Sequence, residues 1–205
     1  MSDQQYAVLV PVKPPAIGKS RLAELPTEHR RDLAEAFALD TISAAAAAGR
    51  VGAVLVVTDD VDFSFAAGAL GAVTIPDGVS NDLNGTLRQA AAESARRWPG
   101  LLPVALCADL PALRSEDLDA ALAQVVPDRA CFVPDAADIG TTLYVAPLTE
   151  FDPRFGPGSC EAHLDAGARM LADVPLSVRL DVDDPSDLRS AVDLGVGQRT
   201  AALIS

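Results

Sequence analysis

Residues 51–58, with the sequence VGAVLVVT, decide the fold class of this chain. They form a continuous apolar and β-branched run of strand length, and such strands belong to sheets that are covered on both faces. The preceding residues 27–48 are rich in Ala and Leu and end before Gly49, a pattern typical of a long helix. The sequence therefore predicts a helix that leads directly into a buried strand.

The same alternation of strand-length and helix-length segments extends through the first 125 residues. Helix-length connections between strands predict a mostly parallel sheet with helices on both faces. The predicted strands cover residues 6–12, 51–58, 72–75 and 101–107, and the predicted helices cover residues 27–48, 62–70, 83–98 and 115–125, the last capped by Ser115.

Beyond residue 130 the pattern changes to shorter elements, which predict a mixed C-terminal part of the sheet. A final helix begins with Asp184 as its cap and Pro185 at its first position. No segment resembles a linker, so we expect one domain over residues 1–205. The predicted elements here are strands at 130–134, 142–146 and 175–182, a Pro/Gly-rich loop at 151–159 and a helix at 160–168.

The composition excludes several classes of protein. Hydrophobic residues make up 49% of the chain and aromatic residues 4%, so the core must consist of Ala, Val and Leu. Neither a membrane-spanning run nor a basic, apolar signal peptide is present in the sequence. Three cysteines without a Cys-x-x-Cys pair favour a reducing cytoplasm. The net charge of −13 disfavours binding to nucleic acid or to anionic lipid.

The only two lysines of the chain lie in one loop after the first predicted strand. Lys13, Lys19 and Arg21 concentrate positive charge there, and a helix start nearby would add N–H groups that bind phosphate. The Gly-Lys-Ser sequence that ends at Ser20 imitates a P-loop, but Lys13 stands where that motif needs glycine, which excludes a Walker-type NTPase. A solvated basic turn is the alternative interpretation.

Acidic residues lie at or just beyond the ends of two other predicted strands. Asp109 comes just after residues 101–107, at the sheet edge where ligands of open α/β sheets bind. Asp181 and Asp183 are two residues apart, so in an extended segment they point to the same side. Carboxylates are the ligands that Mg²⁺ prefers, and we predict that Asp109 and Asp181 hold it. The role of Asp183 stays open, and acidic turns without metal are the alternative.

Small residues form a fourth candidate site, at Gly140-Thr141-Thr142 and in residues 155–159. Small side chains let a ligand approach the main chain, and Ser159 is predicted to cap the following helix and leave its N–H groups free for an anion. Ordinary turns are the alternative. His29 and His163 have no metal-ligand spacing and no evident Asp partner, so we expect no chemistry from either.

These motifs together resemble the 2-phospholactate or phosphoenolpyruvate guanylyltransferases of coenzyme F-420 biosynthesis. The resemblance covers nearly the whole chain, and the combination of motifs is much more specific than any single one. The matching pieces, in chain order, are VPVK (10–13), KSRL (19–22), LN (83–84), ADLP (108–111), GT (140–141), FG (155–156) with Ser159, and DVD (181–183).

The resemblance implies a Rossmann-like three-layer α/β sandwich of the glycosyltransferase-A type, with GTP as donor and Mg²⁺ as cofactor. It implies that Asp109 and Asp181 bind the metal and that Asn84 lies near the nucleotide. Residues 79–82 depart from the glycine-rich loop of the relatives. By the same resemblance, the triphosphate is contacted by Lys13, Lys19, Ser20 and Arg21, and the acceptor by Thr141, Gly156 and Ser159.

The expected reaction transfers GMP to phosphoenolpyruvate or to 2-phospho-L-lactate, and no residue distinguishes the two acids. The Arg- and Ala-rich composition is typical of a high-GC bacterium, in which the family is expected to use phosphoenolpyruvate. The alternatives are a related nucleotidyltransferase acting on a molybdenum cofactor or a sugar phosphate, a non-catalytic nucleotide-binding domain, and a structural domain. We also expect a cytoplasmic enzyme that hands its product to the next enzyme of the pathway.

Overall fold

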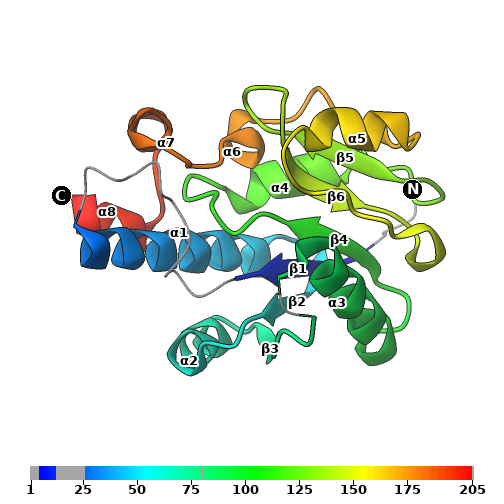
Figure 1. Cartoon of the computed structure of the whole chain (residues 1–205), viewed down its shortest axis with the longest axis horizontal. Coiled ribbons are helices and arrows are strands. Elements are labelled where there is room, and N and C mark those ends of the chain that lie inside the picture. Colours follow the sequence, from blue (N-terminus) through cyan, green and yellow to red (C-terminus); the bar gives the residue numbers. More distant parts are fainter. Residues whose placement is uncertain (1–4, 13–25, 80, 205) are drawn as a thin grey trace.

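The protein is described by a computed structural model that covers residues 5–12, 26–79 and 81–204. Within these ranges seven strands form one sheet in the order β3-β2-β1-β4-β6-β5-β7 (Figure 1). The strands from β1 to β4 are parallel, whereas β6 is antiparallel to both of its neighbours, β4 and β5. The predicted mostly parallel sheet with a mixed C-terminal part is confirmed. The strands are β1 (Tyr6–Pro11), β2 (Val51–Val57), β3 (Val73–Ile75), β4 (Leu102–Leu106), β5 (Cys131–Pro134), β6 (Thr141–Val145) and β7 (Arg169–Met170).

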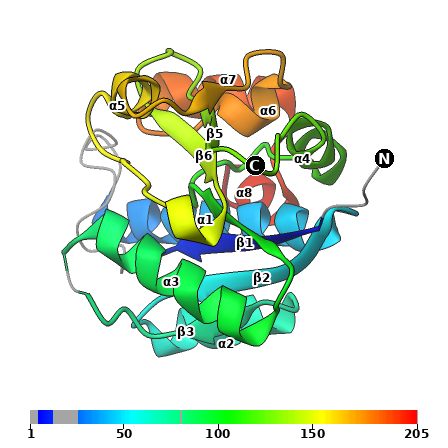
Figure 2. The ribbon, with the colours of Figure 1, turned by 90° about the vertical axis from the view of Figure 1, so that its right-hand side faces the viewer.

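Helices cover both faces of this sheet, which gives the predicted three layers. α1, α2 and α4 share one apolar core with the sheet, and α3 and α5 share the other. Figure 2 shows α3 in front of β1 and β2, with α1 behind them. The helices are α1 (Thr27–Ala47), α2 (Val61–Ala69), α3 (Leu83–Arg97), α4 (Ser115–Leu122), the 3₁₀ helix η2 (Leu148–Glu150), α5 (Ser159–Asp165), α6 (Leu176–Arg179), α7 (Pro185–Leu194) and α8 (Gln198–Ile204).

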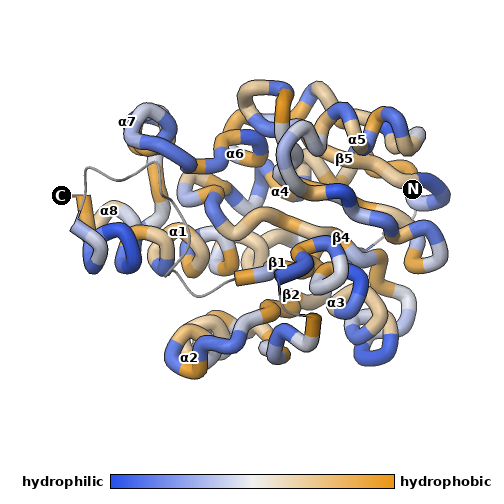
Figure 3. Tube along the Cα trace, in the orientation of Figure 1, coloured by the Kyte–Doolittle hydropathy of each residue, from blue (hydrophilic) through white to orange (hydrophobic). Residues whose placement is uncertain are grey.

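The core is built from small apolar residues, as the composition predicts. On β1, Val8 and Val10 face α1, whereas Leu9 packs with Ala90 and Ala91 of α3. Apolar colours follow β4 and β5 through the middle of the molecule in Figure 3, and hydrophilic colours gather on the turns. Alanine on the facing helix surfaces lets the helices lie close to the sheet. In the described ranges no helix combines the length and the hydropathy that crossing a membrane needs.

The predicted strand at residues 175–182 is wrong. Residues 176–179 form the short helix α6, and the chain that follows has no strand partner among the described residues. Val178, Leu180 and Val182 are all buried, so the alternation that predicts a strand is real. It arises here from burial beneath α1 and α7 rather than from pairing in the sheet. The two-residue strand β7 was missed because so short a run carries no periodicity.

Two helix starts also differ from the sequence prediction. Ser115 is the first residue of α4 rather than its cap, and no side chain caps that helix. The helix α8 was not predicted, because the side chain that hydrogen-bonds to its start lies far away in the sequence. Asp40, in the middle of α1, accepts hydrogen bonds from the N–H groups of Arg199 (3.2 Å) and Thr200 (2.9 Å) at the start of α8.

Candidate active site

The predicted site residues meet at one edge of the sheet because of the strand directions. β4 is antiparallel to β6, so the carboxyl end of β4 meets the amino end of β6. Cys107, directly after β4, donates its N–H to the carbonyl oxygen of Thr142 (2.8 Å). Its thiol lies 3.4 Å from the carbonyl oxygen of Thr141. Asp109 and Thr141 therefore reach the edge at which open α/β sheets bind ligands.

Main-chain hydrogen bonds and one α1 side chain position Asp109. The hydroxyl of Thr41 accepts the N–H of Leu110 (3.1 Å) and donates to the carbonyl oxygen of Phe37 (2.8 Å). Val182 donates its N–H to the carbonyl oxygen of Asp109 (3.0 Å). This last bond brings the acids on either side of Val182 next to Asp109.

Asp109, Asp181 and Asp183 form an acidic cluster beside this edge. Each offers one carboxylate oxygen, and these oxygens lie within 4.8 Å of one another. Burial, followed by the negative charges of Asp109 and Asp183, raises the pKa of Asp181 to about 7. Carboxylates this close repel one another unless a cation neutralises them, and their oxygens are the donors that Mg²⁺ prefers. The donor set therefore fits a divalent metal, with Asp183 as a third candidate ligand.

Two further acids of the same segment accept hydrogen bonds from main-chain N–H groups at the start of α7. Asp184 accepts the N–H groups of Ser186 (2.7 Å) and Asp187 (3.0 Å), and Pro185 is the first helical residue, so the predicted cap is confirmed. Asp187 in return accepts the N–H groups of Asp183 and Asp184, both at 3.0 Å. This capping box fixes the main chain of Asp183, which the sequence pattern alone did not indicate.

A cavity of about 650 Å³ opens beside the acidic cluster. Its walls are the acidic segment with Asp181 and Asp183, the loop of residues 135–141, and the loop of residues 155–159. The volume is that of an ordinary small-molecule site. Thr141, Gly156 and Ser159, the three predicted acceptor contacts, all line this cavity.

The wall formed by residues 135–141 is held by charged side chains. The carboxylate of Asp135 accepts three N–H groups, those of Ala137 (3.1 Å), Ile139 (2.9 Å) and Gly140 (2.7 Å). Arg179 donates to the carbonyl oxygen of Asp135 (2.8 Å) and to the carboxylate of Asp138 (2.6 Å). Since Arg179 is two residues before Asp181, it also ties this loop to the acidic segment.

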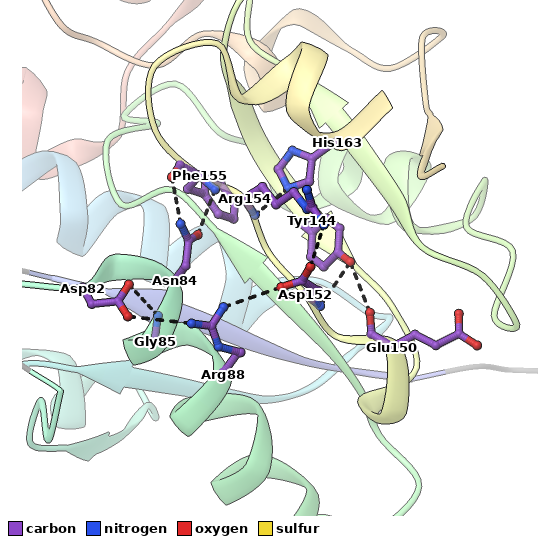
Figure 4. Close-up of polar contacts among 10 residues, drawn as sticks. All are labelled: Asp82, Asn84, Gly85, Arg88, Tyr144, Glu150, Asp152, Arg154, Phe155 and His163. Carbon is purple, nitrogen blue, oxygen red and sulfur yellow. Dashed lines mark hydrogen bonds and ion pairs between the residues drawn. The ribbon is translucent and has the colours of Figure 1, made fainter. Parts of the chain in front are cut away.

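Asn84, the predicted nucleotide contact, holds the opposite wall. It lies in the first turn of α3, and its amide donates to the carbonyl oxygen of Phe155 (3.0 Å) and accepts the N–H of Phe155 (2.8 Å) (Figure 4). Gly156 and Gly158 follow with φ angles of 143° and 71°, which favour glycine. The amide of Asn84 therefore fixes the loop that carries the predicted acceptor residues.

Ser159 does not cap α5, contrary to the sequence prediction. Gly158 is the cap residue, and no side chain bonds the helix start. The N–H groups of Ser159 and Cys160 donate to the carbonyl oxygens of Gly156 and Ile139, both at 3.1 Å. The expectation that the helix start leaves its N–H groups free is wrong for these two, because the loop folds back over them.

His163 was dismissed from the sequence, yet it is fully buried next to the cavity walls. Its Nε2 accepts the N–H of Arg154 (2.9 Å), and its Nδ1 lies 3.0 Å from Oγ1 of Thr141. Ser159, Cys160 and His163 are the buried residues of α5. That spacing gives one buried helix face, and it is the signal in the sequence that could have indicated the position of His163.

The predicted triphosphate contacts Lys13, Lys19, Ser20 and Arg21 lie outside the described residues. β1, which precedes them, is parallel to β4. The carboxyl end of β1 therefore lies at the same sheet edge as Asp109.

The family described as "Guanylyl transferase CofC like" matches residues 6–204 of this chain. The chain belongs to this family. It is therefore a nucleotidyltransferase, and the resemblance inferred from its motifs is confirmed.

Relatives agree with this family, and a solved structure shares the fold. A phosphoenolpyruvate guanylyltransferase from Thermomonospora curvata is 46% identical, over 98% of this chain and 90% of that protein. A protein of the same name from Streptomyces coelicolor is 46% identical, over 97% of this chain and 95% of that protein. A structure described as a nucleotide-diphospho-sugar transferase from Desulfovibrio desulfuricans G20 matches with a TM-score of 0.71 at 20% identity, over 100% and 94% of the two chains. That last similarity confirms the fold.

Proposed function

We propose that this CofC-like enzyme transfers GMP from GTP to phosphoenolpyruvate with Mg²⁺ as cofactor, in the biosynthesis of coenzyme F-420. The relatives of that name support the acceptor. The observation that carries the proposal is the cluster of Asp109, Asp181 and Asp183 beside a cavity of small-molecule size. 2-Phospho-L-lactate is the alternative acceptor, because it carries the same phosphate and carboxylate and differs in the hybridisation of its central carbon.

The reaction exchanges one phosphoanhydride bond for another. An oxygen of the acceptor phosphate forms a bond to the α-phosphorus of GTP, and the bond from that phosphorus to the leaving pyrophosphate breaks. The attacking phosphate is anionic at neutral pH, so no side chain has to remove a proton from it. The requirements are relief of the repulsion between two anions and in-line alignment of the reacting atoms.

Asp109 and Asp181, joined by Asp183, would hold the metal. When bound, Mg²⁺ supplies the positive charge that lets two phosphate groups approach each other. Burial, together with the charges of Asp109 and Asp183, raises the pKa of Asp181 to about 7, so below that pH a bound cation would have to displace the proton of this carboxyl.

The other site residues surround this centre. We assign the acceptor to the cavity wall of Thr141, Gly156 and Ser159, all of which line the cavity. Near the nucleotide we assign Asn84, and on the triphosphate Lys13, Lys19, Ser20 and Arg21. The single domain, the cytoplasmic location and the transfer of product to the next enzyme stand as further proposals from the sequence.

Mass spectrometry of the reaction products tests the proposal. Purified protein is incubated with Mg²⁺, GTP or ATP, and phosphoenolpyruvate or 2-phospho-L-lactate. We expect GTP with phosphoenolpyruvate to give enolpyruvyl-diphospho-guanosine and pyrophosphate, and ATP to react poorly. Asp109→Asn should abolish the product, whereas Asp193→Asn, which changes an exposed acid of α7 outside the cluster, should not. Conversion of neither acid by the wild-type enzyme would rule out this acceptor class.

A further inference from the structure

His163 is enclosed by aromatic rings, although it lies in a short helix of mostly polar residues. Its imidazole stacks on Phe132 at a centroid distance of 5.3 Å and on Tyr144 at 4.8 Å, and the ring of Phe155 meets it edge-on at 5.7 Å. The side chain is completely buried. A polar ring in such surroundings is stable only when both of its nitrogen atoms have partners.

The partner of Nε2 decides where the ring carries its hydrogen. The main-chain N–H of Arg154 can only donate, and it lies 2.9 Å from Nε2, so Nε2 must be the bare, accepting nitrogen (Figure 4). A neutral imidazole then carries its hydrogen on Nδ1. Because Nδ1 is 3.0 Å from Oγ1 of Thr141, His163 donates and the hydroxyl of Thr141 accepts.

The ring stays neutral at physiological pH. Burial lowers the pKa of His163 to about 4, which outweighs the opposing effect of the main chain of Ser159. The protonated ring would carry a hydrogen on Nε2 and would lose its bond to Arg154. Neutral His163 is therefore the form that connects the two segments.

The direction of this hydrogen bond limits which atoms the Thr141 hydroxyl can donate to. Oγ1 of Thr141 cannot give its hydrogen to a nitrogen that already carries one, so the Thr141 hydroxyl hydrogen has to be donated to another acceptor. Thr141 lines the cavity, and the substrates of the proposed reaction carry phosphate and carboxylate oxygens, which accept hydrogen bonds.

We propose that His163 is a positioning residue: by the relay from Arg154 N–H through the imidazole to Thr141, it makes the Thr141 hydroxyl a donor to the anionic acceptor. The inference rests on the proposed function for the identity of that acceptor. Through Arg154 the same ring also holds the main chain directly before Phe155 and Gly156, so one side chain connects two walls of the cavity.

Nitrogen-15 NMR of the wild-type imidazole tests the relay without any substitution or turnover. We expect His163 to be the neutral form with its hydrogen on Nδ1 from about pH 6 to pH 8. A hydrogen on Nε2 would overturn the relay, because Arg154 and Thr141 would then need the opposite polarity. Failure of the enzyme to convert phosphoenolpyruvate would refute the proposed function and leave this spectrum unchanged, so the two failures are distinguishable.

Substitutions then test the effect on acceptor binding. His163→Phe keeps an aromatic ring and removes both nitrogen contacts, and we expect it to raise KM for the acceptor about tenfold while KM for GTP changes less than about twofold. His163→Asn places an amide N–H close to the position of Nδ1 and should recover more acceptor binding than His163→Gln, whose longer amide reaches only toward Nε2. Thr141→Val combined with His163→Phe should be hardly worse than Thr141→Val alone.

Phe63→Leu is the matched control, since Phe63 is a buried aromatic residue of α2 in the other core cluster. It should lower the melting temperature without changing the ratio of the two KM values. Equal rises in both KM values for His163→Phe, or additive effects in the double variant, would show a purely structural role and overturn the proposal.

Discussion

Two walls of the same cavity are positioned by different means. In the acidic wall, Asp109 follows the buried strand β4, and a main-chain bond from Val182 to Asp109 places Asp181 and Asp183 beside it. The loop wall, residues 152–159, has no strand among its residues up to α5. Side chains from elsewhere hold it, chiefly Asn84 and His163.

Figure 4 shows how many separate side chains hold the loop wall. Besides Asn84 and His163, the hydroxyl of Tyr144 accepts the N–H of Asp152 (3.3 Å), and Arg88 of α3 lies 3.6 Å from the carboxylate of Asp152. The exposed ion pair contributes little to stability, whereas the part-buried hydrogen bonds contribute more. The difference between the walls indicates that the fold fixes Asp109 and that individual polar side chains fix the loop of residues 152–159.

The largest expected effect comes from removing a charge of the acidic wall. Asp181→Asn should lower turnover by about 10²-fold or more, because a lost metal ligand removes several kcal/mol of charge stabilisation. The folded structure should persist, since the Asp109–Val182 main-chain bond does not involve this side chain. Initial rates of pyrophosphate release measure the effect. Turnover near the wild-type value would show that Asp181 is not a ligand.

The second effect is the pH dependence of stability that Asp181 contributes in the acidic wall. Folding raises the pKa of Asp181 from its ordinary value of 3.8 to about 7. The folded state therefore holds this proton more tightly, and between these values the contribution of Asp181 to stability should fall as pH rises, by up to about 1.4 kcal/mol per pH unit, whereas the lowered pKa of His163 gives an opposite slope below about pH 6.5. Above about pH 7 this contribution is constant.

Urea unfolding in EDTA at several pH values measures this slope. Asp181→Asn should remove its own share of the slope and be more stable than the wild type near neutral pH. Excess Mg²⁺ should restore wild-type stability over the same range, because the metal takes the place of the proton. Identical slopes for the wild type and the variant would contradict the raised pKa of Asp181 that burial and the neighbouring acids produce.

A third, smaller effect concerns the loop wall. Asn84→Leu removes both hydrogen bonds to Phe155 and should cost about 1–3 kcal/mol of unfolding free energy. We expect KM for the acceptor to rise more than kcat falls, since the metal ligands stay in place. Thermal unfolding and steady-state kinetics check both parts. An unchanged acceptor KM together with unchanged stability would show that Asn84 does not support the acceptor loop.

The smallest expected effect on activity comes from the side chain of α1 that supports the main chain next to Asp109. Thr41→Val keeps the shape of the side chain but leaves the buried N–H of Leu110 without its partner. The loss should destabilise the protein by about 1–3 kcal/mol and lower turnover less than about tenfold. A loss of activity as large as that of Asp181→Asn would mean that Thr41 matters as much as the strand for placing Asp109.

The sequence predicted the acidic wall better than the loop wall, and the reason is physical. Asp109 follows an apolar run whose length and composition indicate a buried parallel strand, so its place at the ligand edge follows from general rules. The roles of His163 and Asn84 depend on contacts with Arg154 and Phe155, which no local pattern encodes. The false strand at 175–182 has the same origin, because burial with period two does not require a partner strand.

The most direct test of the account is calorimetric titration of Mn²⁺ or Mg²⁺ into the wild-type protein and into Asp109→Asn, Asp181→Asn and Asp193→Asn, with phosphoenolpyruvate present. Divalent cations should bind to the wild type and to the exposed-acid variant Asp193→Asn. Binding should be lost or greatly weakened when Asp109 or Asp181 is changed. Unaltered cation binding by the Asp109 and Asp181 variants would contradict the central claim that these carboxylates form the metal centre.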